Sequence, residues 1–363
     1  MPAGPNDLKQ FTIPSLWDAS YLERYRLADG TTYEQFVGDV AAALAIANGD
    51  LLSDPLLSGL ISVTDEIAVE YEIGATNGFQ DHTEYSRPDA GRGATSGHML
   101  PLNAYDRGLG WTWDMLRKAR RRQLTADIAS AIRDLKDIWA QKILTRLFQS
   151  TADTVGTGSS VPLADGGVAD ASYIPLPVPD RGGTFLATHD HITFLDGITQ
   201  ANLETALQHL WEHGYNAPFD LLISQVDIGS WTNSANVTGW IPRADPAIRY
   251  GATADLANVA DDYLGVIETD LGAARVRATG RVPTGFWSTF KSYGPLDERN
   301  PLVVRLDPEV GQAICRMLSG DHIRDYPLEN AILFAEFGVG VMDRVGAVVI
   351  ENDAAAYTDP TIS

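Results

Sequence analysis

The residues whose types and spacing best suit a chemical role are histidines. His209, Glu212 and His213 form the pattern HxxEH in a segment predicted to be helical. Residues four apart share a helix face, so both imidazoles can bind one Zn²⁺ while Glu212 acts as base, as in the inverted zinc-protease motif. The alternative is two histidines on the solvated side of the helix. We favour this alternative, because Gly214 follows directly and the sequence places no third ligand nearby.

A second histidine pair, His189 and His191, lies two residues apart, and such residues share a face when they are in a strand. The pair follows a glycine-rich stretch, so we expect an exposed turn here. The sequence contains neither GxxxxGK[ST] nor GxGxxG for phosphates, and no GxSxG nucleophile elbow. We therefore predict no catalytic residue, no metal site and no cofactor.

The strongest charge signal is a basic block that places five cations in six residues: Arg117, Lys118, Arg120, Arg121 and Arg122. The block lies at the start of a predicted helix, where the helix dipole disfavours positive charge. Such a placement calls for an acidic partner. DNA is one alternative, but we favour an acidic surface of this chain or of a neighbouring subunit.

The elements around the block are a long hairpin and a long helix. Residues 66–73 alternate apolar and polar side chains, as in a half-exposed strand. Residues 74–97 hold five glycines and few aliphatic side chains, and 99–111 are predicted as the returning strand. From 113 to 149, apolar residues recur at three- and four-residue steps without Pro or Gly, which predicts one uninterrupted helix about 55 Å long.

The rest of the chain alternates strands and helices. We predict a helix over 33–47 that Thr31 or Thr32 caps and Asn48-Gly49 ends, and a Pro-rich connector over 151–184. Gly338 and Gly340 lie inside a predicted strand, where glycine marks a bulge or a close backbone approach. The remaining predictions are a helix over 200–214, a helix over 308–318, and strands over 219–224, 264–268, 274–278, 302–306, 331–341 and 346–351.

Composition limits the class of protein. The 363 residues carry 27 Lys and Arg against 48 Asp and Glu, a formal charge of −21, which argues against a nucleic-acid binder. The length predicts two or three lobes. Cys315 is the only cysteine, so no internal disulfide can form, and we expect a small buried side chain. The longest apolar run is far shorter than a membrane span, which indicates a protein without membrane segments.

The order of these elements resembles the major capsid protein of tailed bacteriophages, the Hong Kong 97-type fold. Three stretches carry the resemblance: hairpin 66–111 running into helix 113–149, the segment ITQANLETALQHLWEHGYNAPFDLLIS over 198–224, and the ending FAEFGVGVMDRVGAVVIEN over 334–352. The resemblance implies an α+β fold with an N-terminal arm, an extended loop, a spine helix, a peripheral domain and an axial domain.

This resemblance also implies a domain layout. Residues 1–50 would be the N-terminal arm and its helix, and 51–111 the extended loop hairpin. Residues 112–216 would form the peripheral domain with spine helix and connector, and 217–325 the axial domain. Residues 326–363 would add the closing strands of the peripheral domain.

The implied function is structural and non-catalytic: pentamers and hexamers of an icosahedral virus head around double-stranded DNA. The implied partners are further copies of the chain, a separate scaffolding protein, a portal and a cement protein, with assembly in the host cytoplasm and a final location in the virion. The alternatives are a bacterial encapsulating nanocompartment and a zinc hydrolase that uses residues 209–213.

The expected assembly contacts lie in three segments. Besides the basic block they include hairpin and arm residues, namely Gly78, Arg87, Arg92, Phe11 and Trp17. Some members of the family join subunits covalently through a lysine of the extended loop. Here the five lysines are residues 9, 118, 136, 142 and 291, and none lies between 74 and 111. We therefore expect non-covalent interlocking.

Overall fold

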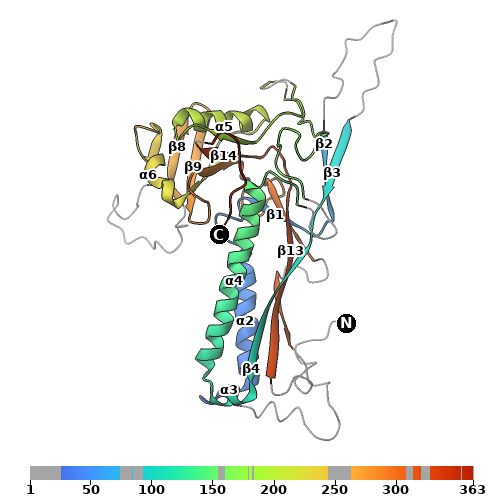
Figure 1. The fold of residues 1–363 in the computed structure, drawn as a ribbon, viewed down its shortest axis with the longest axis vertical. Coiled ribbons are helices and arrows are strands. Elements are labelled where there is room, and N and C mark those ends of the chain that lie inside the picture. The colour runs from blue at the N-terminus through green and yellow to red at the C-terminus, as the bar shows by residue number, and fades with distance from the viewer. Residues whose placement is uncertain are drawn as a thin grey trace. The chain divides into compact units, whose positions relative to one another are not determined.

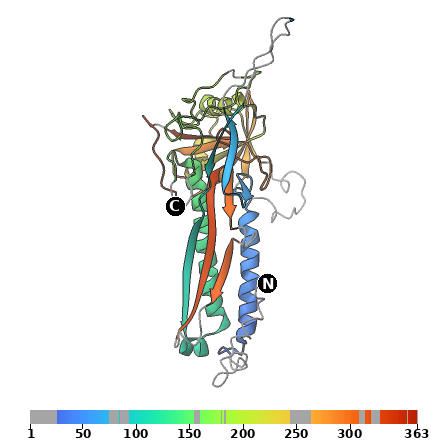
Figure 2. The same cartoon turned by 90° about the vertical axis from the view of Figure 1, so that its right-hand side faces the viewer.

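The computed structural model in Figures 1 and 2 describes residues 26–73, 84, 93–153, 160–178, 180–181, 184–243, 263–307, 314–319, 328–352 and 354–362. The chain divides into two units. The first comprises Met1–Leu51, Ala104–Ile138 and Gln312–Glu336, and the second comprises Leu52–Asn103, Trp139–Gly311 and Phe337–Ser363. Among the described helices, none combines the length and apolar character that crossing a bilayer requires.

Helix α2 (Tyr33–Leu52) opens the described part of the first unit. Thr32 Oγ1 accepts the Gln35 backbone N–H at 3.2 Å while Gln35 Oε1 accepts that of Thr32 at 3.1 Å, a reciprocal cap that confirms the predicted start. The predicted end at Asn48-Gly49 is wrong. Asn48 is occupied by hydrogen bonds of 3.0 and 2.9 Å to the backbone of Cys315, and the helix continues to the buried Leu51.

The predicted uninterrupted helix is two helices, α3 (Trp113–Lys118) and α4 (Arg121–Phe148). Ala119 between them is extended, with φ −73° and ψ 148°. Its carbonyl accepts the Ala28 backbone N–H at 3.0 Å, and the Arg121 N–H donates to Asp29 at 2.8 Å. The break therefore has a physical cause in a segment about ninety residues earlier in the chain.

One strand prediction and one helix prediction also need correction. The return of the hairpin is divided into β3 (Ala94–Met99), which pairs with β2 (Ala68–Ile73), and β4 (Asn103–Thr112), which pairs with β13 (Leu328–Val341). Residues predicted as the end of a helix over 308–318 form strand β12 (Cys315–Ser319), antiparallel to β13 from Cys315↔Ala335 to Ser319↔Ala331. In Figures 1 and 2, the long axes of α2, α4, β4 and β13 are roughly aligned with one another.

The second unit is built on a seven-stranded sheet of order β5-β14-β10-β6-β9-β8-β7. Its strands are β5 (Ile192–Leu195), β6 (Phe219–Ser224), β7 (Trp240–Pro242), β8 (Tyr263–Thr269), β9 (Gly272–Thr279), β10 (Phe286–Phe290) and β14 (Ala347–Asn352). Helix α5 (Gln200–Glu212) packs against β10 and β14, and η2 (Gln225–Asp227) and α6 (Ile228–Trp231) follow β6. The predicted strands 219–224, 264–268, 274–278 and 346–351 are confirmed.

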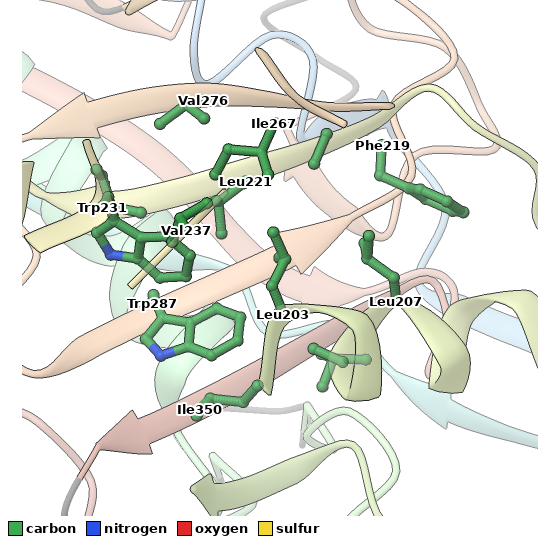
Figure 3. Packing of buried hydrophobic residues seen from close by; sticks show 14 of the residues in the cluster. Leu203, Leu207, Phe219, Leu221, Trp231, Val237, Ile267, Val276, Trp287 and Ile350 are labelled. Carbon is green, nitrogen blue, oxygen red and sulfur yellow. The ribbon is translucent and has the colours of Figure 1, made fainter. Parts of the chain in front are cut away.

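The core of this sheet lies beneath α5, as Figure 3 shows. Leu203 and Leu207 project from the helix toward alternate residues of the strands, and the Thr199 side chain caps the helix by accepting the Asn202 N–H at 3.1 Å. Trp231 and Trp287 meet edge to face with ring centroids 5.1 Å apart. This core fixes both ends of α5, including His213, its C-terminal cap.

The second unit also holds β1 (Ile61–Thr64), parallel to β11 (Leu302–Leu306), and β11 pairs with residues 337–341 of β13. The close backbone approach predicted at the two strand glycines is confirmed at Gly338, where a Cβ would overlap the Pro101 carbonyl oxygen. At Gly340 a Cβ would overlap a side chain instead, at Leu100 Cδ2. In β2, Val69 points inward and Glu70 and Glu72 are exposed, as the alternation predicts.

Candidate functional site

The basic block meets acidic side chains of its own chain. Lys118, whose side chain is 74% exposed, pairs with Asp114 at 2.6 Å one helical turn away. Arg121 pairs with Asp39 of α2 at 2.6 Å, and its backbone N–H donates to Asp29. That hydrogen bond lowers the pKa of the Asp29 carboxyl, which is ionised at the N-terminus of α4.

The two neighbouring arginines, Arg120 and Arg122, are exposed, as Arg121 is, but unlike Arg121 they form no ion pair with the described residues. The Arg120 backbone N–H donates to Gln123 Oε1 at 2.9 Å as a cap of α4. Arg117 belongs to α3, but its side chain lies outside the described part. The expected acidic partner is therefore present for Lys118 and Arg121. Sequence reasoning missed Asp29 and Asp39, because nothing local marks them as partners of a helix so far along the chain.

The other expected assembly residues are Gly78, Arg87, Arg92, Phe11 and Trp17, and all five lie outside the described residues. Their role stays a prediction.

The histidines predicted as exposed come together inside the second unit. His191 is fully buried, which makes the exposed-turn prediction wrong. Its backbone N–H donates to Ala164 at 2.7 Å and its carbonyl accepts the Val349 N–H at 2.8 Å, so it extends the edge of the sheet beside β14. His189 precedes it by two residues, and His213 arrives from the end of α5.

The three rings converge through their Nε2 atoms. His189 Nε2 lies 3.1 Å from His191 Nε2 and 2.8 Å from His213 Nε2. One ligand nitrogen from each of the three histidines lies within 4.8 Å of the others. The Phe185 ring stacks on His213 with centroids 4.3 Å apart and covers it with apolar surface.

Burial makes these imidazoles neutral. It lowers the pKa of His189 to about 4 and that of His213 to about 3, and the repulsion that would arise between neighbouring charged histidines adds to both shifts. Burial also holds the pKa of His191 well below its ordinary value. Since a neutral imidazole keeps a lone pair, no ligand would have to lose a proton near pH 7.

The HxxEH pair does not form the site that the zinc-hydrolase interpretation requires. His213 joins His189 and His191, whereas His209 is not in that group of three. A surface cavity that His209 and Glu212 line together with Asp270 contains none of the other three histidines. His209 and His213 are both half-buried, so the prediction of a solvated pair is also wrong. Sequence reasoning found all four histidines but had no means of bringing the two motifs together.

Comparison with known proteins identifies the fold. No protein-family model matches the chain, and no curated protein matches it significantly. A chain from Mycobacterium phage Patience is 21% identical and superposes with a TM-score of 0.64 over 96% of this chain and 97% of its own length.

Weaker matches include the capsid of a native GTA particle (TM-score 0.49, 11% identity, 83% of this chain and 91% of that one). Another is the mature capsid of bacteriophage PhiM1 (TM-score 0.49, 9% identity, 81% and 86%). The order of helices and strands, shared almost end to end with the Patience chain, is that of the Hong Kong 97-type fold of phage major capsid proteins.

Proposed function

We propose that this chain is the major shell protein of an icosahedral phage head. The observation that carries the proposal is the match to the Mycobacterium phage Patience chain, which extends over 96% of this chain and 97% of that one. A match over both full lengths leaves little of the chain for an unrelated activity.

The β2–β3 ribbon supports this proposal. Among the residues that the structure describes, the two strands pair only with each other, from Ala68↔Met99 to Ile73↔Ala94. An isolated two-stranded ribbon has little stability in water. Met99 in the ribbon is 45% exposed and Ile67 beside it is 56% exposed. A neighbouring subunit lying against the ribbon would cover these apolar side chains.

In this proposal the subunits gather as pentamers and hexamers and enclose double-stranded DNA without reading its sequence. The formal charge of −21 suits a container, because an acidic wall makes few phosphate contacts and lets packed DNA leave. The proposal adds a separate scaffolding protein, a portal and a cement protein as partners, and assembly in the host cytoplasm.

The proposal is tested by electron microscopy of the purified full chain, expressed alone or together with the proposed scaffolding, portal and cement proteins, and of virions that contain the chain. We expect large closed particles in both kinds of sample, with nuclease-resistant DNA inside the virions. Particles filled with an enzyme instead of DNA would identify a nanocompartment. A chain that stays monomeric under every assembly condition would refute the shell function.

Denaturing electrophoresis of the same particles tests how the subunits are held. We expect single-chain bands, because no lysine lies in the hairpin, and a covalent ladder would contradict non-covalent interlocking.

A further inference from the structure

We propose that His189, His191 and His213 form a binding site for one divalent transition-metal ion, Zn²⁺ by the character of its ligands. The site is independent of the shell function, since it depends only on contacts within the second unit.

The orientation of His191 is the first argument. Its Nδ1 lies 2.9 Å from the Ala347 carbonyl oxygen, which can only accept, so Nδ1 carries the proton. The Nε2 atom of this fully buried ring therefore holds a lone pair that faces His189. Metal-binding histidines commonly donate their other N–H to a backbone carbonyl in this manner, which fixes tautomer and ring orientation.

Proton counting is the second argument. His189 Nε2 lies within hydrogen-bond distance of the Nε2 atoms of both His191 and His213. If His189 carries a proton on Nε2, that proton is directed at one of the two acceptors. If His213 Nε2 carries the proton and donates it to His189 Nε2 instead, His189 Nε2 has no proton to donate to His191 Nε2. One buried lone pair is thus left without a full hydrogen bond, which is unfavourable away from water. A cation at the centre would engage all three lone pairs.

Distance and ligand type select the ion. Zn–N bonds of about 2.0–2.1 Å at tetrahedral angles place ligand nitrogens about 3.3 Å apart. The observed 2.8 and 3.1 Å need small outward shifts of the rings from His189, and the ligand nitrogens of His191 and His213, which lie within 4.8 Å of each other, would move closer together. Imidazole ligands suit Zn²⁺, whereas Mg²⁺ and Ca²⁺ prefer oxygen.

His209 is the candidate for the fourth position. Its ring centroid lies 5.5 Å from that of His189 and 5.6 Å from that of His191. Its Nδ1 is buried without a hydrogen-bond partner among the described residues. A rotation of this ring would close the coordination sphere with a fourth protein ligand, and structural zinc sites are closed in this way whereas catalytic ones keep an open position. The ion would then tie the segment before β5 to the C-terminal end of α5.

Metal analysis of the untagged full chain tests this proposal. The protein is stripped with a chelator, dialysed and titrated with ZnCl₂, and bound zinc and Tm are measured. We expect one zinc per chain and a Tm several degrees higher at saturation, since a ligand that binds only the folded state stabilises it. Zinc well below one per chain, or an unchanged Tm, would overturn the site.

Variants locate the ion. His213→Gln and His189→Gln should weaken zinc binding at least tenfold, because each removes a ligand. Glu212→Gln is the matched control: it lies next to His213 on α5, is not a ligand, and should bind zinc as the wild type does. Equal zinc binding by all three variants would refute the assignment.

A spectroscopic measurement keeps the test independent of variant folding. CoCl₂ added to the stripped wild-type chain should give the visible absorption of four-coordinate cobalt with nitrogen ligands, and ZnCl₂ should displace it. A spectrum identical to cobalt in buffer would rule out the site.

Discussion

At the scale of single residues, backbone contacts decide which positions tolerate change. Gly338 lies in β13 where the Pro101 backbone approaches closely and leaves no room for a side chain, and at Gly340 the Leu100 side chain takes up the space. The pattern Gly-x-Gly inside an apolar strand was enough to predict a close approach. The sequence could not say which segment approaches, because Pro101 lies more than two hundred residues away.

Gly338→Ala should therefore destabilise the fold by about 3 kcal/mol or more, since the new methyl group would overlap the Pro101 carbonyl. Gly229→Ala is the control, because a Cβ at this exposed position of α6 meets nothing within 4 Å. Urea unfolding of both variants gives the comparison. Equal stability of the two would contradict the close approach.

Arg344 is the second residue whose contacts should make a substitution strongly destabilising. Its side chain is 1% exposed, and it donates to the Pro162 carbonyl at 3.0 Å and to Asp170 at 3.0 Å. Asp165 lies 3.7 Å away, and the guanidinium lies 4.1 Å from the Tyr173 ring centroid. One arginine thus holds the connector between residues 162 and 173.

Arg344→Ala should cost about 3–5 kcal/mol, because it leaves the buried Asp165 and the half-buried Asp170 without their cation. Arg344→Lys should fall between this variant and the wild type, since lysine keeps the charge but not the planar fork. Arg299→Ala removes an exposed arginine whose partner Asp297 is two residues away and should change stability little. A loss of similar size for Arg344→Ala and Arg299→Ala would show that the buried network is unimportant.

At the scale of elements, local signals predicted some elements and missed others. Helix α5 and strand β6 follow from a capping Thr199, a regular apolar stripe and a continuous apolar run. The break at Ala119 and the strand β12 depend on hydrogen bonds to Ala28, Asp29 and Asn48, all distant in sequence. No pattern within the segments themselves could reveal them.

The histidine cluster is missed for the same reason. Each motif is recognisable alone, but the contact between His189 and His213 depends on the packing of α5 over the sheet. Periodicity predicts the helix, and it cannot predict what its last residue will touch.

The basic block can now be divided into a folding part and an assembly part. Arg120→Glu with Arg122→Glu alters only exposed side chains, so we expect an unchanged Tm and a reduced yield of particles. Arg121→Glu should lower the Tm, because it places a carboxylate beside Asp39 and Asp29. Thermal melts and particle counts by electron microscopy separate the two effects. A double variant that assembles normally would remove the block from the assembly contacts.

At the scale of the whole molecule, the β2–β3 ribbon is expected to matter for assembly and to matter little for the folding of a single chain. Within the described residues its strands contribute few apolar side chains to the cores: Val69 is buried with Leu100 and Val303, and Tyr71 packs against this cluster. A segment with so few buried apolar contacts adds little to the stability of one chain. Its role is expected between chains.

Replacing residues 74–93 by Asn-Gly joins Ile73 to Ala94 through a two-residue hairpin turn. We expect a folded chain with a Tm within a few degrees of the wild type and no robust shells. As a control, residues 74–93 are replaced by a Gly/Ser segment of the same length. This control distinguishes the effect of loop length from the effect of side chains such as Arg87 and Arg92. Intact shells from the shortened chain would refute interlocking.

The buried Cys315 makes this chain convenient for labelling. It is the only cysteine, it is 4% exposed, and burial raises its pKa to about 11. A thiol in this state is inert toward maleimide dyes at neutral pH, because the thiolate is the reactive form. A single cysteine introduced on the surface would then take one fluorophore per subunit, and energy transfer between fluorophores would report how subunits come together in real time.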